Sequence, residues 1–183
     1  CFGCDIDYSL GKNFADFADQ FSKDSRYRTE LYKLRRKFMS HADGLIHADL
    51  HTSNIMASRD KMKVIDMEFA FMGPFGYDLG YLVGNLISQY CAACFKRFPS
   101  EQSRKQFKAY LLATIKSLIE TYMKTFTLCW EKSVKERYRG QQGLLQSILQ
   151  EVMEDVPGYA SMVNWFRSVS EIPYPDFDII EDK

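Results

Sequence analysis

The stretch HADLHTSNIMASRDKMKVIDMEF, residues 47–69, is the part of the chain that decides its fold. Short apolar runs alternate there with polar residues, a pattern typical of short strands and loops. We expect Ser58 to Lys61 to reverse the chain between two strands, so that Asn54 faces Asp66. Directly opposed residues of an antiparallel pair lie about 5 Å apart between their α-carbons. The sequence therefore predicts a small hairpin with an amide and a carboxylate together at one end.

Further carboxylates flank this predicted pair. Asp49 lies one loop upstream, and Glu68 points to the same side as Asp66 if the chain there is extended. Grouped carboxylates repel one another unless a cation offsets their charge. Mg²⁺ prefers oxygen ligands and is commonly held by one or two carboxylates together with substrate phosphates. We therefore expect Asp66, Glu68 and Asn54 to hold Mg²⁺.

The spacing H-x-D-x-x-x-x-N, formed by His47, Asp49 and Asn54, matches the catalytic loop of protein kinases except for its arginine. In that mechanism the aspartate takes the proton of the acceptor hydroxyl, while the asparagine helps to hold metal on the ATP phosphates. Asp49 is therefore the predicted catalytic base, and ATP the predicted donor. We expect His47 and Asp78 to support the loop. His51 either contacts substrate or hydrogen-bonds the loop backbone.

The rest of the chain carries apolar residues at three- and four-residue steps, which is typical of amphipathic helices. Pro157 and Gly158 interrupt this pattern near the C-terminus. The helices that the spacing predicts cover residues 14–40, 77–95, 101–130, 141–153 and 159–170. The predicted fold class is α+β and mostly helical, a helical body with one inserted hairpin. We expect the 183 residues to form one compact unit.

Charge and hydropathy exclude several classes of partner. Lys plus Arg number 24 and Asp plus Glu number 24, so no overall basic field attracts nucleic acid or anionic lipid. No apolar run approaches the ~20 residues that span a bilayer, and the start lacks the order of a secretory signal. We expect a cytoplasmic protein with no nucleic-acid or membrane partner.

Two cysteine pairs have the C-x-x-C spacing of some zinc sites, Cys1 with Cys4 and Cys91 with Cys94. The second pair lies in the apolar stretch LISQYCAACFKRF, which is typical of a buried helix. Cysteine packs there as a small hydrophobe, so we expect core packing in preference to zinc.

Taken together, HADLHTSNIM and VIDMEFAFMGPFGYDLGYLVGNLI resemble the methylthioribose kinase family, a branch of the aminoglycoside and choline kinase-like fold. That family has a catalytic segment of the form HGDLHTGSIM and a metal segment of the form DPEFAFYGPMGFDIGAFIGN. The first is matched by His47, Asp49, Leu50, His51, Thr52, Ile55 and Met56, and the second by Asp66, Glu68, Phe69, Ala70, Phe71, Gly73 and Pro74. The D-x-E form distinguishes this family from its generic relatives, which more often have D-x-D.

The resemblance implies that residues 1–183 are the C-terminal lobe of a protein-kinase-like fold, without the N-terminal nucleotide lobe. It implies ATP-dependent phosphorylation of the small sugar 5-methylthioribose at its anomeric hydroxyl, a step of methionine salvage. The oligomeric state stays open, with a homodimer of the full-length protein as one option. Asp49 would be the base, and Asp66 and Glu68 the metal ligands. No Gly-rich loop precedes His47, so we expect the chain alone to be inactive, since positioning the phosphates is most of the catalytic work.

Three positions depart from the family pattern. Ala48 replaces a glycine, which matters little if the backbone angle there is ordinary. Asn54 replaces a serine, which moves the site toward the wider kinase pattern. In GYASMVNWFRSV, Phe166 takes the place of the first of two substrate-binding arginines, and Arg167 that of the second. Losing one guanidinium removes up to five donors, so the exact sugar stays open.

Some interpretations remain open at this point. Arg167 either binds substrate or is a surface charge on a helix, and Trp130 and Trp165 either line a substrate pocket or pack in the core. The protein could also be a kinase for another small alcohol, such as choline, homoserine or an aminoglycoside. A third hypothesis is a non-catalytic binding module derived from a kinase.

Overall fold

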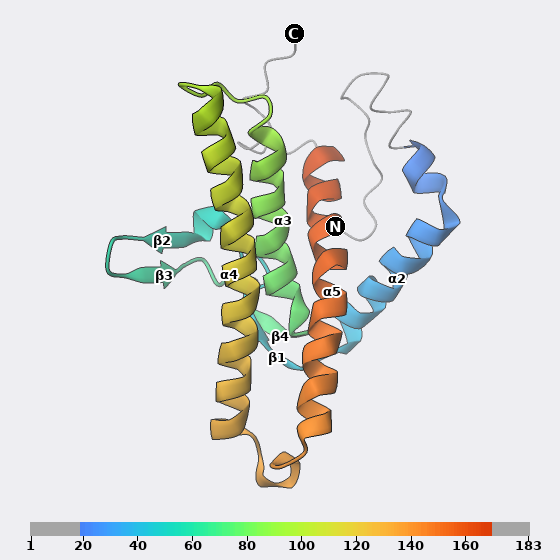
Figure 1. The fold of residues 1–183 in the computed structure, drawn as a ribbon. Coiled ribbons are helices and arrows are strands. Elements are labelled where there is room, and N and C mark those ends of the chain that lie inside the picture. The colour runs from blue at the N-terminus through green and yellow to red at the C-terminus, as the bar shows by residue number, and fades with distance from the viewer. Residues whose placement is uncertain (1–18, 170–183) are drawn as a thin grey trace.

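The computed structural model describes residues 19–169. In chain order its elements are α2 (Ser25–Ser40), β1 (Gly44–Ile46), the 3₁₀ turn η1 (Thr52–Asn54), β2 (Ile55–Ala57), β3 (Met62–Val64), β4 (Phe71–Gly73), α3 (Gly76–Ala92), α4 (Glu101–Ser133), the 3₁₀ turn η2 (Glu136–Tyr138) and α5 (Gln142–Val169). Figure 1 shows α3, α4 and α5 side by side, with α2 leaning against α5. The predicted mostly helical fold is confirmed.

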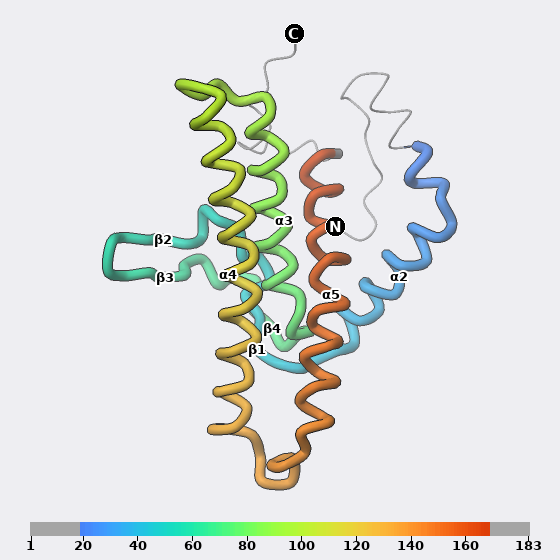
Figure 2. The backbone as a smooth tube through the Cα atoms, viewed as in Figure 1, coloured from blue at the N-terminus to red at the C-terminus, as the bar shows by residue number. Residues whose placement is uncertain are grey.

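Two antiparallel strand pairs lie between α2 and α3. The hairpin of β2 and β3 was expected, and it projects from the helical body (Figure 2). The second pair was not expected: β1 and β4 pair so that Gly44 faces Gly73 and Ile46 faces Phe71. This outer pair brings the two ends of residues 47–70 together, so the motif-bearing segment is anchored at its base.

The hairpin turn is tighter than the sequence predicted. The Ser58 N–H donates to the Lys61 carbonyl at 2.8 Å, so only two residues form the loop, a length that suits the twist of paired strands. Pairing is shifted by one residue as a result, and the Ile65 N–H donates to the Asn54 carbonyl at 3.0 Å. Asn54 therefore faces Ile65, and the predicted pairing of Asn54 with Asp66 is wrong.

Glycines on one face of α3 allow a close approach to α5. Gly76, Gly80 and Gly84 follow at four-residue steps, which places them on one side of the helix. A Cβ added at Gly80 would lie 2.7 Å from the Tyr159 Cβ, and one at Gly84 would lie 2.9 Å from the Ala160 carbonyl oxygen. No side chain fits between the two backbones at these positions, so the glycines set the distance between α3 and α5.

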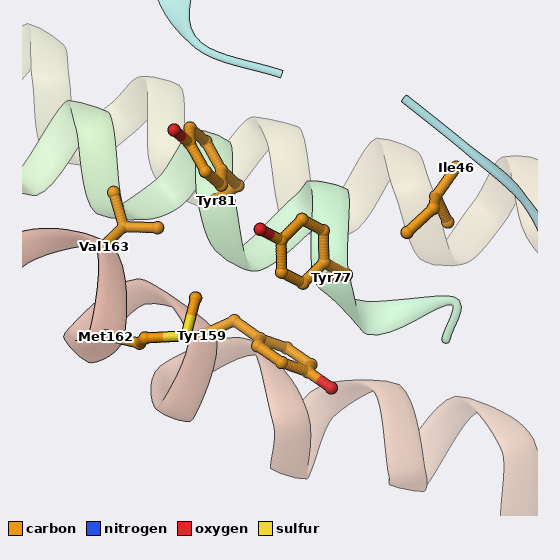
Figure 3. Close-up of a cluster of buried hydrophobic side chains, with 6 residues drawn as sticks. All are labelled: Ile46, Tyr77, Tyr81, Tyr159, Met162 and Val163. Atoms are coloured by element: carbon orange, nitrogen blue, oxygen red, sulfur yellow. The ribbon is translucent and has the colours of Figure 1, made fainter. Parts of the chain in front are cut away.

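The main core fills the space beside this contact. One cluster of buried side chains joins β1, α3 and α5, and Figure 3 shows its members between the helices: Ile46, Tyr77, Tyr81, Tyr159, Met162 and Val163. A second cluster joins α3 and α5 to the inner face of α4 and is made of Leu79, Val83, Val152, Val156 and Ala160. Helix α3 therefore has core on two sides, and the residues at its start are held firmly.

The last helix is continuous, which corrects the predicted break at Pro157 and Gly158. Helix α5 runs from Gln142 to Val169 with the proline inside it. An interior proline removes one backbone hydrogen bond and costs about 3 kcal/mol. Val156 and Tyr159, on either side, are almost fully buried against α3, and that packing offsets the cost. Gly158 packs on Leu34 of α2, where a Cβ would lie 2.6 Å from the leucine Cδ1.

The first predicted helix is interrupted, and its residues 14–18 lie outside the described range. Residues 19–23 are helical, and Asp24 then leaves the helix with φ −69° and ψ 112°. Its carboxylate accepts hydrogen bonds from the N–H groups of Arg26 and Tyr27 at 2.8 and 3.1 Å. Asp24 therefore caps α2, because an aspartate oxygen satisfies N–H groups that a helix start leaves unpaired.

The predicted burial of Cys91 and Cys94 is wrong. Both thiols are exposed, while Ala92 and Ala93 between them are fully buried, so the helix turns its alanines to the core. Cys94 Sγ accepts a hydrogen bond from Lys108 Nζ at 3.1 Å. The first pair, Cys1 and Cys4, lies outside the described residues. Between residues 19 and 169, no helix is long and apolar enough to cross a bilayer.

Candidate active site

The carboxylate of Asp49 is held from two sides. Asp49 lies in the loop between β1 and η1, and its Oδ1 accepts a hydrogen bond from the Tyr81 hydroxyl of α3 at 3.0 Å. Its Oδ2 lies 3.4 Å from His51 Nε2. The side chain remains 29% exposed, so a ligand can still reach it. These contacts orient a reachable carboxylate, which a general base needs.

His47 connects the loop to the segment that carries Asp66. Its Nε2 lies 2.8 Å from the carbonyl oxygen of Ile65, and its Nδ1 lies 3.3 Å from the Asp49 N–H. The carbonyl can only accept and the N–H can only donate, so the neutral ring carries its proton on Nε2. The residue is 5% exposed. His47 thus hydrogen-bonds to both halves of the motif-bearing segment.

Asp78 holds the backbone of the same loop. Its carboxylate accepts hydrogen bonds from the N–H groups of His47, at 2.6 Å, and Ala48, at 3.0 Å. Burial raises the pKa of Asp78, and these two hydrogen bonds oppose that rise because they favour the charged form. Asp78 lies in the first turn of α3, where the helix dipole favours a negative charge.

The backbone angle at Ala48 is not ordinary, so the condition under which replacing the family's glycine would matter little is not met. Its φ is 66°, in the left-handed region that favours glycine. An alanine there costs about 1–2 kcal/mol. Successive N–H groups around such a residue form a concave nest for an anion, and the Asp78 carboxylate occupies it. The contact with Asp78 therefore explains why the strained angle persists.

Asn54 is buried at 5% exposure at the end of η1. Its amide nitrogen donates to the Asp49 carbonyl at 3.1 Å, and its backbone N–H donates to the His51 carbonyl at 3.0 Å. The amide nitrogen is thus committed to the catalytic loop. The amide oxygen is the atom of this side chain that can serve as a ligand to a cation.

Asp66 and Glu68 are both exposed, and the chain between them is not extended. Asp66 has φ 65°, and a turn follows in which the Ala70 N–H donates to the Met67 carbonyl at 3.1 Å. Strand alternation therefore does not place the two carboxylates on one side, and that basis for grouping them is wrong. In the part of the chain that the structure describes, no three His, Cys, Asp or Glu side chains lie close enough to hold a metal.

The structure brings Asp49, His51, His47, Asn54 and Asp78 together around one loop, and it leaves the Asp66 and Glu68 side chains outside that hydrogen-bonded group. Sequence reasoning missed Tyr81, which contacts Asp49 directly. A signal for it was available. Tyr81 follows Asp78 by three residues, so the two lie on the same face of α3 and reach the same loop.

The structure tests only part of what was predicted for Phe166 and Arg167, near the end of α5. Arg167 follows Val163 by one turn and is 8% exposed, so the interpretation as a surface charge is wrong. Phe166 is half-buried. The substrate-binding role of Arg167 stays a prediction. Trp165 stacks on Phe21 with ring centroids 5.5 Å apart, a packing contact within the protein.

Comparisons with known proteins agree with the motifs. Residues 8–118 match the phosphotransferase enzyme family. The methylthioribose kinase of Geobacillus sp. (strain WCH70) is 34% identical over 168 residues, which cover 92% of this chain and 40% of that protein. The methylthioribose kinase of Geobacillus thermodenitrificans (strain NG80-2) is 36% identical over 160 residues, 87% of this chain and 38% of that protein.

A plant relative, methylthioribose kinase 1 of Oryza sativa subsp. japonica, is 38% identical over 110 residues, which cover 60% of this chain and 25% of that protein. The chain spans about two fifths of the length of the two bacterial relatives. The family match covers more than half of the chain and includes the whole of the loop around Asp49. The chain therefore belongs to the phosphotransferase enzyme family.

Proposed function

We propose that the protein to which this chain belongs phosphorylates a hydroxyl of a small sugar with ATP, and that the sugar is 5-methylthioribose. The product would be its 1-phosphate, an intermediate of methionine salvage. The observation that carries the proposal is the Asp49 carboxylate, which is reachable and held by Tyr81 and His51 on a loop tied to Asp78. Relatives named methylthioribose kinase support the choice of sugar.

In this proposal Asp49 is the general base. It accepts the proton of the sugar hydroxyl as that oxygen attacks the terminal phosphorus of ATP, and the bond from phosphorus to the leaving oxygen of ADP breaks. A base must lie about 2.6–3.2 Å from the proton donor, so orientation matters as much as basicity. The hydrogen bond from Tyr81 fixes one carboxylate oxygen, which leaves the other toward His51 and the acceptor.

Asn54 and Asp66 fit Mg²⁺ by the chemistry of their atoms. The Asn54 amide turns its nitrogen to Asp49, which leaves an oxygen, and Asp66 follows Ile65, the residue that Asn54 faces. An amide oxygen and one or two carboxylates with substrate phosphates are a usual magnesium site, and we propose Glu68 as the second carboxylate. When bound, the ion neutralises charge on the phosphates.

His51 and Arg167 are proposed as substrate contacts. His51 Nε2 lies beside the Asp49 carboxylate, so a hydroxyl that reaches Asp49 also comes within range of this ring. Arg167 is buried one turn beyond the core residue Val163, and its fixed charge can bind a sugar oxygen. A site with one arginine and a phenyl ring should therefore differ in its sugar specificity from a site with two arginines.

The test is a screen of acceptors with the full-length protein, ATP and MgCl₂. Formation of ADP is measured with 5-methylthioribose, ribose, choline, homoserine and an aminoglycoside at equal concentrations. We expect the highest kcat/KM for 5-methylthioribose and a lower value for ribose, because ribose lacks the apolar methylthio group. A higher kcat/KM for one of the amines would refute the proposed sugar, and no transfer to any acceptor would refute the proposed reaction.

A further inference from the structure

A cavity of about 360 Å³ lies away from the Asp49 loop, where the end of α2, the start of α3 and the connection from α4 to α5 converge. Neither Asp49 nor the side chains that hydrogen-bond to it are part of its lining. Sites for small molecules usually have volumes of about 300–1,000 Å³. The cavity is therefore large enough for a small organic ligand and separate from the candidate active site.

One wall of the cavity is aromatic and well supported. It contains Trp130 of α4, Tyr138 of η2 and Phe75, which precedes α3. Trp130 stacks on Phe126 with centroids 6.5 Å apart, and Phe126 meets Phe75 edge to face at 5.0 Å. The Arg137 guanidinium lies 4.6 Å from the centroid of the Tyr138 ring. The rings are thus held in place, and one of them already contacts a cation.

The opposite wall carries more negative than positive charge. Lys37 Nζ lies 2.5 Å from carboxylate oxygens of both Glu151 and Asp155, and Asp43 adds a third carboxylate to the lining. His41 lies at the rim, its Nδ1 3.8 Å from Asp43 and 4.0 Å from Glu151. The three carboxylates of this wall have one lysine ammonium group among them. Burial raises the pKa of Asp155, and the hydrogen bond from Lys37 opposes that rise.

We infer that this cavity binds a small organic cation, an amine with an apolar or aromatic body. Its ammonium group would approach the carboxylates of Asp43 and Glu151 from the cavity, while His41 contacts them from the rim, and would add positive charge to this acidic wall. Its body would lie against Trp130, because a cation or ring beside an indole face is stabilised by the ring quadrupole and by burial. An anion of the same shape would be repelled. Since Asp49 takes no part, the inference stands apart from the proposed phosphoryl transfer.

Three ligands of nearly equal shape test the charge requirement on the full-length protein by isothermal titration calorimetry: phenethylamine, 2-phenylethanol and 3-phenylpropionate. We expect phenethylamine to bind at least about tenfold more tightly than the alcohol, and the carboxylate not to bind. Equal affinity of the amine and the alcohol would overturn the inference, because the carboxylates would then contribute nothing.

Variants test the location. Glu151→Gln is the direct one, since this side chain is 47% exposed and Lys37 keeps its contact with Asp155 when the Glu151 charge is removed. It should weaken phenethylamine binding about tenfold, and Trp130→Phe should weaken it less. Glu154→Gln is the matched control: it makes the same change on the same helix, at a residue outside the lining, and binding should stay as in the wild type. Equal affinities of the two glutamine variants would place the ligand elsewhere and overturn the inference.

Discussion

Replacement of Gly80 by alanine tests the close contact between α3 and α5, on which the position of the candidate site depends. The new Cβ would lie 2.7 Å from the Tyr159 Cβ, 3.0 Å from the Val156 carbonyl oxygen and 3.4 Å from the Val156 α-carbon. Tyr159 is fully buried, and the other two atoms are backbone, so none of them is the free end of a flexible side chain. The helices must separate to admit the methyl group.

Two opposing effects set the magnitude. Alanine is favoured over glycine inside a helix by about 1 kcal/mol. An extra methyl group in a packed core costs about 1–3 kcal/mol, and the upper end applies here because the obstacle is largely backbone. The free energy of unfolding should therefore fall by about 2 kcal/mol. In a chain of this size that lowers Tm by about 4–8 °C.

The assay is urea unfolding followed by circular dichroism, with Gly143→Ala as the matched control. Gly143 lies near the start of α5, and a Cβ there meets nothing within 4 Å. Its replacement should leave stability unchanged or raise it by up to about 1 kcal/mol. If Gly80→Ala proves as stable as Gly143→Ala, then α3 and α5 are not in the contact described and the reasoning is refuted.

Three further substitutions test the loop around Asp49. Ala48→Gly should raise the free energy of unfolding by about 1 kcal/mol in urea, because it relieves the left-handed angle; an unchanged value would contradict the strain assigned to that residue. Asp78→Asn should lower the free energy of unfolding by about 1–3 kcal/mol at pH 7, because the amide nitrogen cannot accept the hydrogen bond that one of the two backbone N–H groups donates. Wild-type stability would show that Asp78 does not hold the loop. Tyr81→Phe should lower the kcat of the full-length protein about tenfold with little loss of stability, and an unchanged kcat would show that its hydroxyl does not position Asp49.

Local pattern was enough to predict the hairpin and the long helices, but not the register of the strands. The turn Ser-Arg-Asp-Lys contains no glycine or asparagine that would specify a two-residue loop. Both a two-residue and a three-residue turn fit that sequence, and a one-residue difference changes the partner of Asn54. The sequence did not predict the left-handed backbone angles of Ala48 and Asp66 either, because neither residue is a glycine.

The remaining differences come from tertiary packing. Helix α5 passes through Pro157 because its neighbours are buried against α3, and helical periodicity along the chain cannot reveal that support. Tyr81 contacts Asp49 across 32 positions of sequence, and only its spacing from Asp78 on the same helix face pointed to that loop. Asp78 was easier to identify, because a carboxylate in the first turn of a helix beside a loop suggests a loop contact from sequence alone.

The most direct test of the account compares the full-length protein with its Asp49→Asn variant under saturating ATP, MgCl₂ and 5-methylthioribose. The account predicts that kcat falls by about 10²–10⁴, because the base is lost, while Tm and circular dichroism stay as in the wild type. Asp60→Asn, the same change at an exposed residue of the hairpin loop, should retain full activity. A kcat for Asp49→Asn within about twofold of the wild type would contradict the role of Asp49 as catalytic base.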